Sequence, residues 1–254
     1  MEEAGALALP LLLVLVVGGG AVYWHHHRRQ VMRAGLERLA TRDHLRLTDR
    51  PCGLARGQLA GRFDATPAGD RRYGLRHAVE GEVDVALDGR TVRASLACFE
   101  WWWEVRTQGD HGPSYQTRTC TVAAVRLPVA VPGTIRLKPE GVLGRVGLRR
   151  ADQQLESEEF NRRFHVRGSD PQLTVRFLDA AMQHRLLTTT TGRTIHLERD
   201  LLLLGGTPAH RDGSLPGVIG QFPAAAQDLL GLLRAVPAQV WRTAAPVTGS
   251  GGAP

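Results

Sequence analysis

The strongest constraint on this chain is residues 4–24, a stretch that contains no charged side chain. A helix of that length spans about 31 Å, close to the hydrocarbon thickness of a bilayer. Tyr23 and Trp24 stand at its end, where the aromatic side chains of membrane helices gather. Residues 18–20 are three glycines, which membrane helices tolerate better than water-soluble ones. The stretch therefore predicts a transmembrane anchor over residues 1–24.

The charges around this stretch predict its orientation. Glu2 and Glu3 precede it, whereas Arg28, Arg29 and Arg33 follow it. A cleaved signal peptide is the alternative, but such a peptide carries its positive charge before the apolar core. Positive residues stay on the cytoplasmic side. We therefore expect a single-pass protein of the cell membrane, with its N-terminus outside and its C-terminal domain in the cytoplasm.

The composition argues against a nucleic-acid partner and against a zinc site. The net charge is +7, but the arginines are scattered along the chain, and a DNA-binding protein concentrates its charge on one element. We expect no nucleic acid, no cofactor and no metal, since the spacings of Cys52, Cys98 and Cys120 match no zinc motif. The expected partners are the lipid bilayer and another membrane or cytoplasmic protein, and the oligomeric state stays open.

Alternating apolar residues predict a strand-rich domain. A period of two runs through residues 83–87, 91–106 and 115–127, and Asp88-Gly89 is a tight-turn pair. A hairpin centred on Gly109 would place Cys98 opposite Cys120, and whether these two thiols pair is left open. A second hairpin is predicted over residues 193–198 and 201–204. Helices are predicted over residues 171–187, capped by Ser169, and over residues 222–236.

These elements predict an α+β fold. It consists of one N-terminal transmembrane helix followed by a mixed domain with antiparallel β-hairpins and two packing helices. The predicted boundaries are the anchor (residues 1–24), a basic juxtamembrane helix (residues 25–48), the soluble domain (residues 49–241) and a flexible tail (residues 242–254).

One stretch resembles a known family. The residues Glu158, Phe160, Asn161, Arg162, Phe164, Val166 and Asp170 form the pattern E-x-F-N-R-x-F-x-V-x-x-x-D. This pattern resembles a family of bacterial, actinobacterial-type membrane-anchored proteins of unknown function. The resemblance implies one membrane helix and an α+β cytoplasmic domain, and it implies no catalytic residues.

The most unusual local feature is the triplet Trp101-Trp102-Trp103. The period of two turns Trp102 away from its neighbours, so it is the candidate for a binding surface, since Trp is enriched at interaction hot spots. Arg28, Arg29 and Arg33 are the candidates for holding anionic lipid. The leading hypothesis is a membrane-tethered, non-enzymatic interaction or scaffold protein. A membrane-associated enzyme with a site near His111 or His210 and an anionic-lipid-binding module are the alternatives.

Overall fold

The structure is a computed structural model of the 254-residue chain. The description that follows covers residues 27, 30, 33–35, 37–38, 40–41, 44–54, 72–109, 112–139, 155, 157–189, 192–205 and 220–247.

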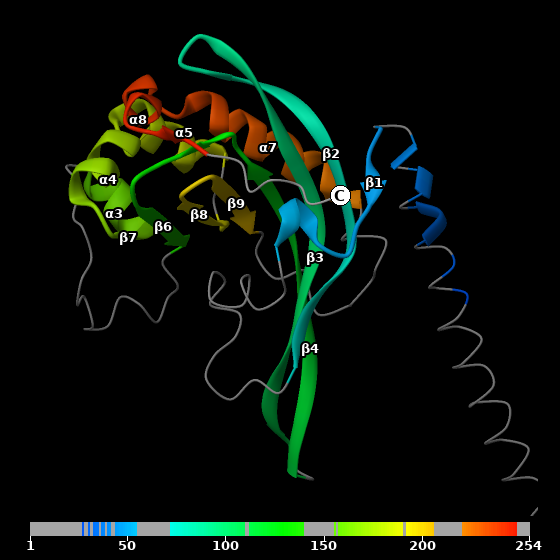
Figure 1. Ribbon diagram of the computed structural model, residues 1–254. Coiled ribbons are helices and arrows are strands. Elements are labelled where there is room, and N and C mark those ends of the chain that lie inside the picture. Colours follow the sequence, from blue (N-terminus) through cyan, green and yellow to red (C-terminus); the bar gives the residue numbers. More distant parts are fainter. Residues whose placement is uncertain are drawn as a thin grey trace, which may run out of the picture.

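An eight-stranded antiparallel sheet forms the centre of the protein (Figure 1). In spatial order its strands are β1 (Arg46–Leu47), β2 (Tyr73–Leu87), β3 (Arg90–Gly109), β4 (Gly112–Arg126), β9 (Leu201–Gly205), β8 (Thr194–Glu198), β6 (Thr134–Pro139) and β7 (Phe164–Gly168). A separate two-stranded sheet pairs β5 (Val129–Ala130) with β10 (Ala245–Pro246), within the range for which a flexible tail is predicted.

Helices gather on one face of this sheet (Figure 1). They are α3 (Glu158–Arg163), α4 (Pro171–Phe177), α5 (Ala180–Thr189), α7 (Phe222–Ala235) and α8 (Ala238–Arg242). The longest, α7, packs across β2, β3, β4 and β9. Its buried side chains Ala225, Leu229 and Leu233 recur at intervals of four, so one stripe of the helix faces the sheet. The helices and this face of the sheet enclose the larger of two apolar clusters.

The opposite face of the sheet carries a second apolar cluster, which includes Phe99, Trp101, Trp103 and Val122. The central strands are therefore buried on both faces. In β9 all five residues are buried, and in β4 residues 120–125 are buried in succession. Strands buried on both faces show continuous apolar sequence in place of alternation. The apolar run at residues 201–204 follows this rule.

The predicted fold class is wrong. The hairpins are not separate units, because β9 pairs with β4 and β8 pairs with β6, so that all of them join one sheet. Five helices, α3, α4, α5, α7 and α8, pack with the sheet, where two packing helices were predicted. The predicted anchor, residues 1–24, lies outside the described residues. No helix within the described residues is long and apolar enough to cross a membrane.

The long hairpin exists, but its predicted register is wrong by three residues. Cys98 lies opposite Ala123, and Cys120 lies opposite Trp101. A shift by an odd number of residues turns one strand's side chains to the other face. Cys98 therefore faces the helices, in the larger cluster, whereas Cys120 belongs to the cluster on the opposite face. All three cysteines are present as thiols.

The helix predicted over residues 171–187 is interrupted. It ends as α4 at Phe177 and restarts as α5 at Ala180. Asp179 lies in the break, and its carboxylate accepts a hydrogen bond from the backbone N–H of Met182 at 2.8 Å. Asp170, and not Ser169, caps α4 by accepting hydrogen bonds from the next two backbone N–H groups of the helix.

Candidate functional site

The predicted lipid-binding arginines are only partly described. Arg28 and Arg29 lie outside the described residues. Arg33 lies in a helical segment, its side chain is 78% exposed, and its Nε donates to Glu37 at 2.9 Å, one helical turn away. An exposed ion pair of this kind contributes little stability.

Trp102 is the least buried of the three tryptophans. Trp101 and Trp103 are buried in the second cluster, whereas Trp102 is half-buried and faces the other way. The guanidinium of Arg76 lies 5.7 Å from the centroid of the Trp102 ring, within the range of a cation–π contact. Trp102 thus stands on the sheet as an aromatic side chain with a half-exposed cation beside it.

The same arginine neutralises a buried carboxylate. Glu100 is fully buried, two residues before Trp102, and Arg76 binds it with two hydrogen bonds. The Nε2 atom of His77 lies 3.7 Å from the same carboxylate. Consecutive residues reach one partner because β2 bulges here, with His77 at φ 55°. Arg76, Glu100 and Trp102 form what we call the Arg76 cluster.

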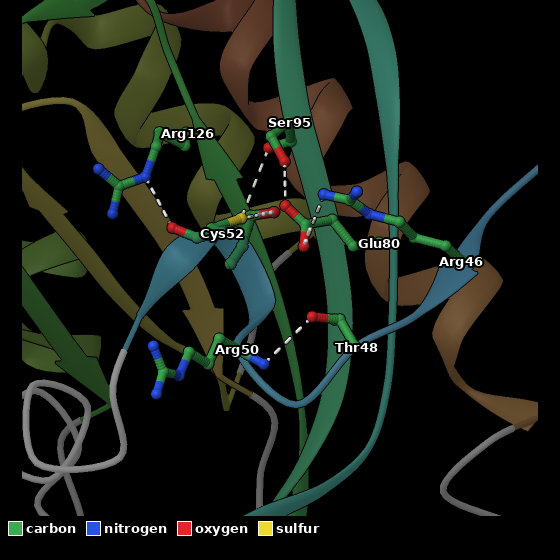
Figure 2. A network of polar contacts seen from close by, with 8 residues as sticks. Arg46, Thr48, Arg50, Cys52, Glu80, Ser95 and Arg126 are labelled. Atoms are coloured by element: carbon green, nitrogen blue, oxygen red, sulfur yellow. Dashed lines mark hydrogen bonds and ion pairs between the residues drawn. The ribbon is translucent and has the colours of Figure 1, made fainter. Parts of the chain in front are cut away.

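A second polar network fastens the N-terminal segment to the sheet (Figure 2). Cys52 lies in a short 3-10 turn, η1 (Pro51–Gly53), with φ 52°. Its backbone carbonyl accepts from Nε of Arg126 at 2.8 Å, and the Nη1 atom of Arg126 binds Asp200 at 2.8 Å. Its thiol points at the carbonyl oxygens of Ser95 (3.6 Å) and Ala124 (3.7 Å). We call these five residues the Cys52 clasp.

Glu80 extends the clasp toward β1. Its carboxylate accepts a hydrogen bond from the Ser95 hydroxyl, and Arg46 lies 3.9 Å from its other oxygen (Figure 2). The backbone N–H of Thr48 donates to the carbonyl of Ala78 at 3.1 Å. Gly81 leaves room for the side chain of Leu45, whose Cδ2 lies where a Cβ at this position would be. Every polar group in this network holds one segment of chain to another.

None of the three thiols is suited to nucleophilic attack. Burial raises the pKa of Cys52 to about 12, and the charge of Glu80 adds to the effect. Burial also raises the pKa of Cys98 and Cys120 to about 12. Since the thiolate is the reactive form, all three are protonated and unreactive near neutral pH. The described residues also contain no group of His, Cys, Asp and Glu that could hold a metal ion.

Several residues of the family-like pattern, and Ser157 just before it, have structural roles. Ser157 caps α3, and Phe160 stacks on Phe164 with ring centroids 4.9 Å apart. Asn161 bonds both backbone groups of Leu155, accepting from its N–H at 3.1 Å and donating to its carbonyl at 2.6 Å. The pattern thus fixes the α3–β7 connection and the start of α4. The family resemblance itself stays a prediction.

Sequence reasoning missed Arg76 as a partner of Trp102 and Glu100. The strand over residues 73–79 was not predicted, because the bulge interrupts its alternation. The enzyme alternative pointed to His111 and His210, and both lie outside the described residues. A signal for the Cys52 clasp is present in Pro51-Cys52-Gly53, a turn-forming tripeptide.

Comparisons with known proteins add little to this geometry. No protein-family model and no curated protein matches the sequence. Among solved structures, the mycobacterial trehalose monomycolate transport factor A, TtfA, is weakly similar, with a TM-score of 0.44 and 14% sequence identity. The similarity covers 86% of this chain and 98% of that one. At this level the likeness carries no conclusion about what this chain binds.

Proposed function

We propose that this protein is a non-enzymatic binding module that acts at the cytoplasmic face of a cell membrane. In this proposal it contacts a protein partner through the Arg76 cluster and the outer ribbon, which we define as residues 105–109 of β3 paired with residues 112–116 of β4. The charges that follow residues 4–24 support the location, and the geometry of the sheet supports the contact surface.

The outer ribbon is the observation that carries the proposal. β2 pairs with β3 only as far as Trp103, and β9 pairs with β4 only from Val122, so within the described part of the chain the ribbon has no third strand. It projects away from the helices (Figure 1). Residues 113–118 are all exposed, including Tyr115 at 44%. A two-stranded ribbon is only marginally stable in water. A segment of this kind is therefore better suited to contacting a partner than to forming part of the core.

The side chains along this surface suit a protein partner. Tyr, Trp and Arg are enriched in the cores of protein interfaces. Arg106 and Tyr115 are directly opposite on the ribbon, and Trp102 stands at its base beside Arg76. No described strand pairs with residues 112–121 of β4 on the side away from β3, so backbone groups there can pair with an extended peptide.

The ionisable groups support binding over catalysis. Glu100 is held by Arg76, and the thiols of Cys52, Cys98 and Cys120 are protonated in apolar surroundings. A general base or nucleophile needs access and a pKa near the working pH. The three thiols have neither, and Glu100 is fully buried, so all four groups serve to hold the sheet together.

Site-specific photocrosslinking in native membranes tests the proposal. A photoreactive amino acid at Tyr115 is expected to give a discrete adduct, and Trp102→Ala in the same chain is expected to reduce its yield several-fold. The matched control places the same group at Val175 on α4, which is 61% exposed. Two results would refute the proposed surface. One is the same adducts from both positions. The other is an adduct yield from Tyr115 that is unchanged by Trp102→Ala while the variant stays folded.

A further inference from the structure

One half-buried arginine in the helical layer has no carboxylate beside it. Arg185 lies on α5, which packs against α7 on the helical face of the sheet (Figure 1). Its side chain has neither a hydrogen-bond acceptor nor an ion-pair partner among the residues that the structure describes. A guanidinium stays charged at physiological pH, so Arg185 carries a positive charge that the described part of the chain does not neutralise.

Other half-buried arginines of the protein show what Arg185 lacks, because each of them binds a carboxylate. The pairs are Arg76 with Glu100, Arg126 with Asp200 and Arg193 with Asp228. Asp228 is the acidic residue of α7, and Nη1 of Arg193 lies 2.7 Å from its carboxylate. The helix against which Arg185 packs therefore offers it no acid that is not already bound.

Gly231 on α7 sets the position of the Arg185 guanidinium. A Cβ at residue 231 would collide with Nη2 of Arg185 and would lie 3.6 Å from its Cζ atom, so the guanidinium lies against the backbone of α7. Nε is the nitrogen of this group that is buried without an acceptor, and the two Nη atoms remain at the surface. One edge of the group is thus enclosed by the protein, whereas its Nη pair is open to solvent.

A guanidinium held in this way is suited to binding an anion. Its enclosed edge excludes part of the water that would screen the charge, so an anion at the Nη atoms interacts with it more strongly than with a fully solvated arginine. Contact with α7 also restricts the side chain before any ligand arrives, which reduces the entropy lost on binding. A buried donor without an acceptor destabilises a fold and is rare in native proteins. No contact within the described residues offsets that cost at Arg185.

The charge and shape of the group favour a carboxylate. One guanidinium neutralises one negative charge, and its two Nη groups match the two oxygens of a carboxylate. A phosphate dianion needs further cations around the same point. Arg234 on α7 is exposed and follows Gly231 by one helical turn, where it can hold a second carboxylate of the same ligand.

We propose that Arg185 is the binding site for a carboxylate group from outside the chain, with Gly231 as the residue that positions its guanidinium. The carboxylate can belong to an acidic segment of a protein or to a small dicarboxylic acid, since the Nη atoms contact the same two oxygens in both. The site lies on the helical face of the sheet, and it does not depend on the contact proposed for the outer ribbon.

Binding to the full chain in detergent tests the site with two probes, an acetylated tetraglutamate peptide and succinate, each followed by titration calorimetry at low salt. Arg185→Met is expected to weaken saturable binding about tenfold or more, since a bidentate charge-assisted contact is lost. Gly231→Ala keeps the net charge but displaces the guanidinium, and we expect a loss of about fivefold or more. The matched control, Arg162→Met, removes the same charge from an exposed position on α3 and is expected to change the affinity less than about twofold.

Thermal unfolding without a ligand separates binding from a structural role of Arg185. We expect the melting temperature of Arg185→Met to be unchanged or higher, because methionine keeps the apolar stem and removes the buried donor. A lower melting temperature together with unchanged binding would show that Arg185 serves the fold, and it would overturn the proposal.

The pattern of outcomes identifies the source of the carboxylate. Saturable binding of the peptide alone, weakened in Arg185→Met and Gly231→Ala and kept in the control, supports the site and identifies an acidic protein segment. The same pattern with succinate supports the site and identifies a small acid. Equal losses in Arg185→Met and the control, unchanged binding in Gly231→Ala, or no saturable binding of either probe would overturn the site. None of these results alters the crosslinking expected from Tyr115.

Discussion

Arg76 binds Glu100 across two neighbouring strands through a fork of parallel hydrogen bonds. Its Nε donates to Oε2 and its Nη2 donates to Oε1, each at 3.0 Å, and the two residues are directly opposite in the β2–β3 register. Glu100 is fully buried, whereas the Arg76 side chain is 39% exposed. A buried carboxylate is stable only while such a partner is present, so this pair links the stability of the sheet to the surface beside Trp102.

Arg76→Ala is therefore expected to destabilise the protein by about 3 kcal/mol, because it removes the guanidinium that binds the buried Glu100 carboxylate with two hydrogen bonds. Replacing both partners, with Arg76→Met and Glu100→Leu, is expected to recover most of that loss, since no charge then stays buried. Urea unfolding of the two variants and the parent measures both effects. A double variant no more stable than Arg76→Ala would show that the ion pair is not the source of the loss.

The buried thiols predict a loss of stability in alkali. In the unfolded chain the thiols ionise around their ordinary pKa of 9.0, whereas in the folded protein burial raises the pKa of each to about 12. The unfolded state then binds fewer protons than the folded state between pH 9 and pH 12, and the free energy of unfolding falls across that window. Below pH 9 this contribution is fully present.

The measurement is the free energy of unfolding against pH under reducing conditions. A variant with Cys52→Ser, Cys98→Ala and Cys120→Val is the control, and we expect a shallower decline above pH 9 than in the parent. Parallel curves for the two proteins would mean that the thiols ionise in the folded state as readily as in the unfolded one.

The register of the outer ribbon predicts a disulfide that can be engineered. Thr107 lies opposite Ser114, and their hydroxyl oxygens are 2.6 Å apart. We expect Thr107→Cys with Ser114→Cys to oxidise readily, since directly opposed side chains have the Cβ separation that a disulfide needs. Mass spectrometry after mild oxidation measures the product. Thr107→Cys with Gln116→Cys is the control, because these positions are not opposed, and faster oxidation in the control would contradict the register.

The family-like pattern predicts where substitutions disturb the helical layer. Asp170→Ala is expected to cost about 1 kcal/mol, because it removes the cap of α4, and Asn161→Ala is expected to cost a similar amount by releasing both backbone groups of Leu155. Arg162→Ala lies in the same pattern but is exposed, so we expect little change. Thermal unfolding compares the three, and an equal loss in Arg162→Ala would refute this division of roles.

Local patterns in the sequence predicted several elements well. The hairpin of β8 and β9 and the helix α7 lie within one or two residues of their predicted ranges. In α7 the apolar residues keep one period for 14 residues, long enough for the stripe to outweigh any local irregularity. The strands β3 and β4 were also predicted. The predicted β3 ended too early, at residue 106, and the predicted β4 began too late, at residue 115.

Two predictions failed because a single residue interrupted a regular sequence pattern. Asp179 interrupts an otherwise continuous apolar stripe by capping a new helix, and the bulge at His77 hides the first half of β2. Register was missed because turn residues alone do not fix how two long strands align. The position of Arg136 between Arg167 and His196 was missed although Arg136 and Lys138 alternate with Ile135 and Leu137, because it depends on pairing between distant segments.

The Cys52 clasp, together with Thr48, attaches the N-terminal segment to the sheet. Thr48, Cys52 and Arg126 tie the segment after the N-terminal helical residues to β2, β3 and β4, so tension on that segment is borne by the middle of the sheet and not by a loop. The outer ribbon is the far end of the same β3 and β4. The N-terminal segment and the outer ribbon are therefore attached to the same two strands, β3 and β4.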